Sequence, residues 1–234
     1  MPRLLPIAFT CLLCCGAAFG QEVDTSLGVS SGIVVRGVAL NGGRPAVQGA
    51  VNFYSAGSWL ASLSGAASRS ASSGEWNLQL LSKLGYAWQL ANDWGGQLSY
   101  VHYAYPLNSE LRAYERDELI ATVAYRDLLA LSVAGLRNDR ASANGRHGSV
   151  AYDLVGRYPV SARVALAAGL GYQDLHRRAG FGYAYGHVGA GADLGPRTGG
   201  ARLDVSYIVT DTTAKRWFGD DASNRWAASL AWTF

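Results

Sequence analysis

The sequence predicts an all-β protein: a transmembrane, antiparallel, up-and-down β-barrel of twelve strands. Three observations support this prediction. Apolar and polar residues alternate with a period of two along most of the chain. Short and long connections alternate between these segments. Beyond residue 20, no apolar run reaches the ~18–20 residues that a membrane-spanning helix requires.

The N-terminal segment has the pattern of a secretory signal peptide. Arg3 is followed by an apolar run and then by the sequence Ala18-Phe19-Gly20, which resembles a cleavage site. We therefore expect residues 1–20 to be cleaved and residues 21–234 to form a single outer-membrane β-barrel domain. The expected location is the outer membrane of a Gram-negative cell.

All three cysteines, Cys11, Cys14 and Cys15, lie in this N-terminal segment. The mature chain is therefore expected to have no disulfide and no cysteine-based metal site. A lipoprotein signal is disfavoured, because Leu13 and Cys14 stand where such a signal requires a small residue before the cysteine.

The composition indicates an exported protein that carries few charges. Charged residues make up 16% of the chain, against roughly 25% in ordinary soluble domains. The formal net charge of +3 falls to +2 without Arg3. No basic stripe is present, so nucleic acid is not expected as a partner. No metal-ligand or cofactor-binding pattern occurs either, and we expect neither a metal nor a cofactor.

The clearest predicted strand is the segment 75–90. Its even positions are nearly all apolar, from Trp76 to Leu90, whereas its odd positions include Asn77 and Lys83. For three strands the sequence does not determine which alternate residues face outward. These strands lie near 59–67, 95–105 and 181–193. The same alternation predicts twelve strands at approximately 25–37, 46–54, 59–67, 75–90, 95–105, 118–126, 128–137, 149–157, 160–173, 181–193, 201–210 and 225–234.

The odd-numbered connections include all the long ones. Bacterial outer-membrane barrels have short periplasmic turns and longer external loops, and an even number of strands places both ends of the barrel domain in the periplasm. The odd connections are therefore expected to lie outside the cell. Because none exceeds about fourteen residues, we do not expect a long loop to fold inward as a plug.

A soluble β-barrel or sandwich would show the same alternation with its apolar face turned inward. Three features argue against it: the polar face has few charges, tryptophans fall near strand ends as in membrane aromatic girdles, and charges avoid the apolar face. The expected girdle residues are Trp59, Trp76, Trp88 and Trp94. The expected pore-lining charges are Arg36, Lys83, Glu118, Arg126, Asp153, Arg157, Arg163, Arg202 and Asp204.

The last predicted strand is apolar at every second position. This pattern with a final phenylalanine resembles the C-terminal signal that outer-membrane proteins present to the barrel-assembly machinery, which we expect as a partner. The residues of this signal are Trp226, Ala228, Leu230, Trp232 and Phe234.

The stretch from Ile33 to Ser55 resembles the N-terminal hairpin of the proteobacterial TorF-type porins. In that family an Arg-Gly pair closes the first strand and a Pro-Ala-x-Gln-Gly run opens the second; here these are Arg36-Gly37 and residues 45–49. Segments 75–86 and 103–106 are also similar, whereas Val34, Val35 and Ala39 depart from the family pattern. The resemblance implies a pore-forming outer-membrane barrel without a defined solute.

Catalytic motifs are weak in this sequence. The segment 28–32 matches G-x-S-x-G, but it lies in a predicted strand with no helix after it, so a nucleophile elbow is not expected. His187 with a serine could in principle serve an acyl hydrolase at the lipid interface, although no motif points to it. We therefore do not expect an enzyme.

These observations predict a porin-like channel that passes small hydrophilic solutes by passive diffusion, in contact with outer-membrane lipid. Small residues at the inward positions of several strands favour an open lumen. The excess of basic residues predicts a weak anion preference, carried mainly by Arg126 and Arg163. The alternatives are a lipid-interface acyl hydrolase and a closed structural or export-accessory barrel. The solute and the oligomeric state stay open.

Overall fold

A computed structural model describes residues 22–70, 74–107, 111–138, 148–195 and 200–234. The expected signal peptide and the loop 139–147 lie outside the described residues. The predicted twelve-stranded antiparallel barrel is confirmed. Its strands are β1 (Glu22–Ser30), β4 (Ala46–Tyr54), β5 (Trp59–Arg69), β6 (Trp76–Ala91), β7 (Trp94–Ala104), β8 (Arg116–Tyr125), β9 (Leu129–Asn138), β10 (Gly148–Pro159), β11 (Val164–Asp174), β12 (Gly182–Asp193), β13 (Ala201–Thr210) and β14 (Arg225–Thr233).

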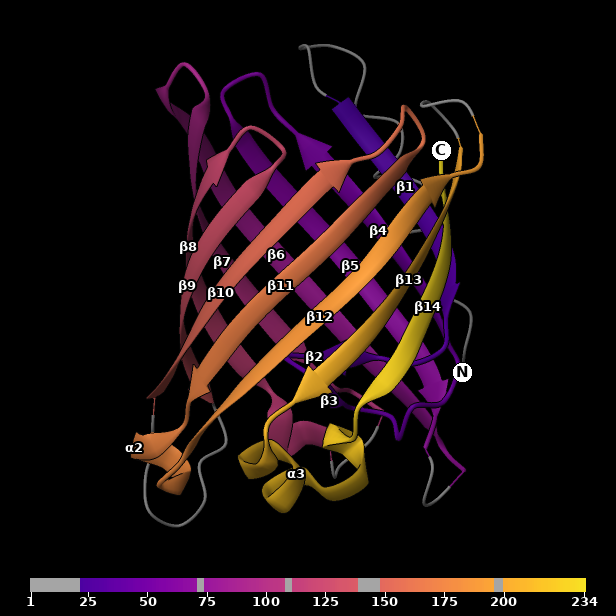
Figure 1. The fold of residues 1–234 in the computed structure, drawn as a ribbon, viewed down its shortest axis with the longest axis vertical. Coiled ribbons are helices and arrows are strands. Elements are labelled where there is room, and N and C mark those ends of the chain that lie inside the picture. Colours follow the sequence, from indigo (N-terminus) through magenta and orange to yellow (C-terminus); the bar gives the residue numbers. More distant parts are fainter. Residues whose placement is uncertain (1–21, 71–73, 108–110, 139–147, 196–199) are drawn as a thin grey trace, which may run out of the picture.

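Consecutive strands of the wall pair with one another, and the barrel closes between β1 and β14 (Figure 1). Leu27 lies opposite Trp232 in this closing pair, and Ser30 lies opposite Ser229. Beyond the paired residues, the Phe234 amide donates a hydrogen bond of 2.8 Å to the Thr25 carbonyl. A closed barrel leaves no strand edge unpaired, as the interior of a membrane requires.

The two ends of the barrel differ. Short turns join the strands at the end where β14 finishes, and longer connections with helical turns occupy the opposite end (Figure 1). The helical elements of that end are η1 (Leu111–Tyr114), α2 (His176–Ala179), α3 (Thr212–Phe218) and η2 (Gly219–Ala222). This arrangement fits the predicted orientation, in which the longer connections face outward from the cell.

The outer face of the wall is apolar. The structure also shows which side chains point outward on the three strands whose direction the sequence left open. Trp59 and Leu63 of β5 point outward, as do Leu98 and Tyr100 of β7 and Val188 of β12, and all five are exposed. An exposed apolar belt of this kind is the surface that a membrane-spanning barrel presents to lipid. Within the described residues, no helix is long and apolar enough to cross a membrane.

The first connection corrects the predicted bounds of the first strand. The predicted strand 25–37 ends at Ser30, and the chain then turns inward and forms a small hairpin of β2 (Val34–Val35) and β3 (Val38–Ala39). Arg36 and Gly37 both have positive φ angles, 49° and 82°, as a tight two-residue hairpin turn requires. The inward element is thus a short hairpin that reaches into the lumen, a feature that the sequence did not predict.

The hairpin is held by a small apolar core at the helical end of the barrel. Val38 packs with Leu175, Tyr183, Ala214 and Ala222, which are all buried. Tyr183 comes from β12, and the other three come from the connections that carry α2, α3 and η2. The hairpin therefore belongs to the packed structure of the barrel mouth, and its apolar residues explain why it turns away from solvent.

Candidate functional site: the constriction of the barrel lumen

Arg36 at the tip of the hairpin forms a two-pronged ion pair with Glu118 on β8. Its Nη1 and Nη2 atoms donate to the two Glu118 carboxylate oxygens over 3.0 and 2.7 Å. The Glu118 side chain is fully buried, and Arg116 on the same strand donates to it from Nε over 2.6 Å. Two arginines thus share one carboxylate, which gives this cluster a formal net charge of +1.

Arg116 is positioned by an aromatic neighbour as well. Its guanidinium lies 3.8 Å from the ring centroid of Tyr103, within cation–π range. For Arg36, which lies outside the wall strands, burial alone would lower the pKa, but the hydrogen bond and charge of Glu118 hold the pKa above its ordinary value. Arg36 therefore stays charged in the lumen.

The opposite side of the hairpin tip contacts the far wall. A Cβ atom on Gly37 would lie 2.6 Å from Cγ2 of Thr210 on β13 and 2.9 Å from Cβ of Tyr185 on β12, so only glycine fits at this point. Glu118 on β8 and Thr210 on β13 lie five strands apart around the twelve-stranded wall. The hairpin tip therefore touches nearly opposite sides of the barrel and crosses the lumen.

The base of the hairpin is fixed by the Asn41 side chain, which is buried. Its Oδ1 atom accepts from the Ile33 amide over 3.1 Å, and its Nδ2 atom donates to the Arg44 carbonyl over 2.5 Å. One amide side chain thus joins the outgoing and returning arms of the connection.

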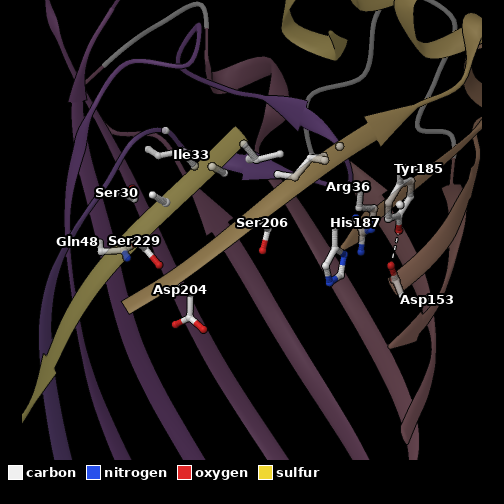
Figure 2. A pocket seen from close by; sticks show the side chains of 17 residues that line it. Ser30, Ile33, Arg36, Gln48, Asp153, Tyr185, His187, Asp204, Ser206 and Ser229 are labelled. Carbon is white, nitrogen blue, oxygen red and sulfur yellow. Dashed lines mark hydrogen bonds between the residues drawn. The ribbon is translucent and has the colours of Figure 1, made fainter. Parts of the chain in front are cut away.

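Two cavities lie beside the hairpin, and Arg36 lines both of them. The inner cavity, of about 430 Å³, is lined by Asp153, His187, Asp204 and Ser206 among others (Figure 2). The Tyr185 hydroxyl donates to Asp153 over 2.5 Å at its edge (Figure 2). The polar side chains of this cavity suit hydrated solutes.

The outer cavity, of about 440 Å³, lies toward the helical end and is more aromatic. Its lining includes Phe181 and Trp217, whose rings stack with centroids 4.4 Å apart. Because the inner and outer cavities share Arg36, the Arg36–Glu118–Arg116 cluster lies at the boundary between them. This cluster and the hairpin form the constriction of the lumen.

Most of the charges expected to line a pore lie on inward-facing positions of the wall strands, but three do not. Arg36 lies on the hairpin, whereas Arg126 and Arg163 lie in short turns at the far end from the helical elements, outside the strands on which the sequence placed them. The residues that face inward from the wall are Lys83, Glu118, Asp153, Arg157, Arg202 and Asp204.

The ion pairs of these charges partly differ from those expected. Arg202 binds Asp204 as expected, at 2.9 Å, and also Asp193, at 2.9 Å. Arg157 on β10, whose expected partner was Asp153, instead pairs at 3.2 Å with Asp127 in the turn between β8 and β9. A separate pair joins the turn residues Arg126 and Asp93 at 3.1 Å. Lys83 makes no side-chain hydrogen bond or ion pair with any described residue.

The aromatic residues expected to mark the membrane boundaries lie on the outside of the barrel. Trp59 and Trp88 flank Tyr86 with ring centroids 5.0 and 6.2 Å away, and Trp94 contacts Tyr125 at 5.0 Å. Trp76 lies at the opposite end of β6 under the Arg69 guanidinium. Of the expected assembly signal, the side chains of Trp226, Trp232 and Phe234 are exposed on the outer face.

Sequence reasoning missed Arg116, Tyr103 and Tyr185, because their proximity to Arg36 depends on the inward path of the hairpin. The sequence left the direction of His187 open, and the structure shows that it lines the inner cavity (Figure 2). Asp117 and Arg137 also contradict the expectation that charges avoid the outer face, since both lie on outward positions of β8 and β9. Among the described residues, no group of three or more His, Cys, Asp or Glu side chains is placed to hold a metal ion.

The closed twelve-stranded wall, its apolar exterior and its polar lumen define a β-barrel of the outer-membrane type. The chain belongs to the family described as "Bacterial protein of unknown function (Gcw_chp)", which matches residues 15–234. No curated protein matches the sequence.

Solved structures share the fold at low sequence identity. The NanC porin superposes with a TM-score of 0.60 at 12% identity, covering 91% of this chain and 99% of its own. The KdgM porin in complex with disordered oligogalacturonate superposes with a TM-score of 0.55 at 8% identity, covering 91% of this chain and 98% of its own. The COG4313 outer membrane channel from Pseudomonas putida F1 superposes with a TM-score of 0.52 at 14% identity, covering 92% of this chain and 95% of its own.

Proposed function

We propose that this protein is a porin-like channel of the Gram-negative outer membrane that passes small hydrophilic solutes by passive diffusion. The observation that carries the proposal is the hairpin crossing the lumen, with cavities of about 430 and 440 Å³ beside it that meet at Arg36. A closed structural barrel would gain nothing from cavities of this size placed on one path. A polar constriction between them is what a diffusion channel needs to limit the size of its solutes.

The small inward residues of the wall support a passage. On β11, the inward positions carry Ala165, Ala167, Gly169 and Gly171. Twelve strands enclose more space than the eight-stranded barrels that side chains fill. The hairpin, rather than the wall, is then the element that sets the width of the channel.

Selectivity in this proposal is a weak preference for anions. Arg126 contributes little, because Asp93 neutralises it at the rim. Lys83, which has no partner among the described residues, and the cluster of two arginines on Glu118 carry most of the positive field, with a smaller part from Arg163. Basic side chains in a narrow, low-dielectric passage favour anions.

Three further expectations belong to this proposal. Residues 1–20 direct export and are cleaved, which leaves residues 21–234 as the barrel domain in contact with outer-membrane lipid. The alternate apolar residues from Trp226 to Phe234 are recognised by the barrel-assembly machinery. The Arg36-Gly37 turn, which closes the lumen hairpin, supports the finer assignment of the chain to the TorF-type porins.

Solute entry into proteoliposomes tests the proposal. Vesicles containing the folded protein are diluted into isotonic sugars of increasing size, and swelling is followed by light scattering. We expect rapid swelling in pentoses and hexoses and slow swelling in trisaccharides, because the constriction excludes larger solutes. Swelling no faster than that of protein-free vesicles in every sugar would refute the channel and favour the closed structural or export-accessory barrel.

A further inference from the structure

Four polar residues form a row on the outer, lipid-facing side of the barrel. Ser82 on β6 lies directly opposite His102 on β7, His102 lies opposite Asp117 on β8, and Asp117 lies opposite Arg137 on β9. Arg137 in turn lies opposite Gly148, the first residue of β10, so the row runs toward the external end of the barrel.

The surroundings of this row are apolar. Leu63 on β5 lies opposite Ser82, and Leu84 and Leu119 flank the row on the same face. These three leucines are 55%, 53% and 54% exposed on the outer surface. A charge on the lipid face of a barrel costs up to ~2–4 kcal/mol at the bilayer midplane and less toward the interface. An ordered set of ionisable residues in this belt therefore indicates a function.

His102 is held in the orientation of a general base. Its Nδ1 atom lies 2.9 Å from Oδ1 of Asp117, which also accepts a hydrogen bond of 2.5 Å from the Tyr100 hydroxyl. In a neutral imidazole, a carboxylate beside Nδ1 favours the tautomer that carries its proton there, in which Nε2 is the acceptor. Since β6 and β8 flank β7, Ser82 lies on the side of His102 opposite Asp117.

Ser82 is available as the nucleophile. Its side chain is exposed, and its hydroxyl forms no hydrogen bond with any described residue. Residues directly opposite on one face of an antiparallel pair have Cβ atoms about 4.5–5.5 Å apart. Ser82 and His102 are therefore close enough for contact in a substrate complex, and nucleophile–base contacts are commonly loose before substrate binds.

We propose that Ser82, His102 and Asp117 form a Ser–His–Asp site that hydrolyses carboxylic esters of acylated membrane lipids. The Ser82 oxygen attacks the ester carbonyl carbon while His102 takes the hydroxyl proton. The tetrahedral intermediate expels the lipid alcohol, which receives that proton and leaves an acyl-serine. Water, deprotonated by His102, then attacks the acyl-serine, so that a free fatty acid is released and the Ser82 hydroxyl is restored.

The location of the row matches this chemistry. The apolar belt around Ser82 receives acyl chains, and the external end at Arg137 approaches the headgroup layer, where water and ester carbonyls meet. The site lies on the outer face, so its activity is independent of whether the lumen conducts. Glycerophospholipids and lipid A share the ester group, and the experiment separates them.

Labelling with a fluorescent fluorophosphonate tests the nucleophile without a lipid substrate. Folded wild-type protein, checked by heat-modifiable migration, should be labelled, and peptide mapping should place the label on Ser82. Ser82→Ala should abolish labelling, and His102→Asn should slow it about 10²–10⁴-fold, the usual contribution of a general base. Ser62→Ala, on the lumen face of β5, is the matched control and should leave labelling unchanged. Absence of label on the folded wild type, or equal labelling of Ser82→Ala, would overturn the proposal.

Fatty-acid release identifies the lipid. Wild-type protein and Ser82→Ala are placed in vesicles of phosphatidylethanolamine and phosphatidylglycerol, and separately in vesicles that also contain lipid A, and free fatty acids are measured by mass spectrometry. Release that requires Ser82 in the first vesicles assigns a phospholipid ester, and release only in the second assigns lipid A. Release in neither, or equal release by Ser82→Ala, would refute the site.

Discussion

Arg36 and Glu118 lie 82 residues apart in the sequence and are joined by a two-pronged ion pair of 3.0 and 2.7 Å across the lumen. Glu118 belongs to the wall, and Arg36 belongs to the hairpin that follows the first strand. The pair therefore fixes the hairpin to the wall, and in the proposed channel it holds the constriction in place.

The ion pair makes Glu118 the residue whose loss should destabilise the barrel most. Glu118→Gln leaves Arg36 and Arg116 buried without their shared carboxylate, and removing one partner of a buried ion pair costs about 3–5 kcal/mol. Arg36→Ala should cost less, because Glu118 keeps its 2.6 Å bond to Arg116. Urea titration of the folded barrel, followed by heat-modifiable migration, measures both changes.

The control for this prediction is the exposed pair of Arg126 and Asp93. Exposed pairs contribute about 0–1 kcal/mol, so Arg126→Ala should shift the unfolding midpoint little. Equal stability of Glu118→Gln and Arg126→Ala would mean that the Arg36–Glu118 pair does not hold the hairpin.

Much of the barrel is predictable from the sequence because the alternation within each wall strand identifies its outward and inward residues. The alternation from Trp76 to Leu90 defines the outer and inner sides of β6 without reference to any other strand. The inward hairpin is not predictable in this way. Val34 and Val35 continue the apolar pattern of a strand, and nothing local indicates that Arg36 meets a carboxylate 82 residues further on.

The outer row was missed for a related reason. Ser82, His102 and Asp117 come from three different strands, and each alone looks like an isolated polar residue at an outward position. Their alignment depends on the register between β6, β7 and β8, which loop lengths and periodicity do not fix.

The C-terminal strand should be critical for assembly. Replacing Trp232 and Phe234 with glutamine is expected to reduce membrane insertion strongly, because it removes outward aromatic residues from the proposed assembly signal. The same replacements at Ser229 and Thr233, which face the lumen, should have a much smaller effect. The amount of heat-modifiable protein in outer-membrane fractions measures insertion, and normal insertion of the Trp232 and Phe234 double variant would refute the signal.

The orientation of the barrel can be tested with single cysteines. Lys215→Cys lies on α3 at the helical end, and Gly57→Cys lies in the short turn between β4 and β5 at the other end. A membrane-impermeant maleimide should label Lys215→Cys on intact cells and should label Gly57→Cys only after the outer membrane is permeabilised. The opposite pattern would invert the orientation while leaving the fold intact.

Selectivity should depend on Lys83 more than on Arg126. Lys83→Ala is expected to move the reversal potential in a salt gradient toward cation preference, because it removes an inward positive charge that no described residue neutralises. Arg126→Ala should change the reversal potential little, since Asp93 already neutralises it. A clear cation preference of the wild-type channel would contradict the proposed selectivity.

Single-channel conductance in planar bilayers tests the central claim, that the hairpin constricts an aqueous pore. A Cβ atom on Gly32 would lie 3.2 Å from the Cα atom of Gly43, so residues 33–42 can be deleted and these two glycines joined with little strain on the wall. We expect discrete, small conductance steps from the wild type and steps several-fold larger from the deletion variant. Equal conductance of the two folded proteins, or no conductance from either, would contradict the account.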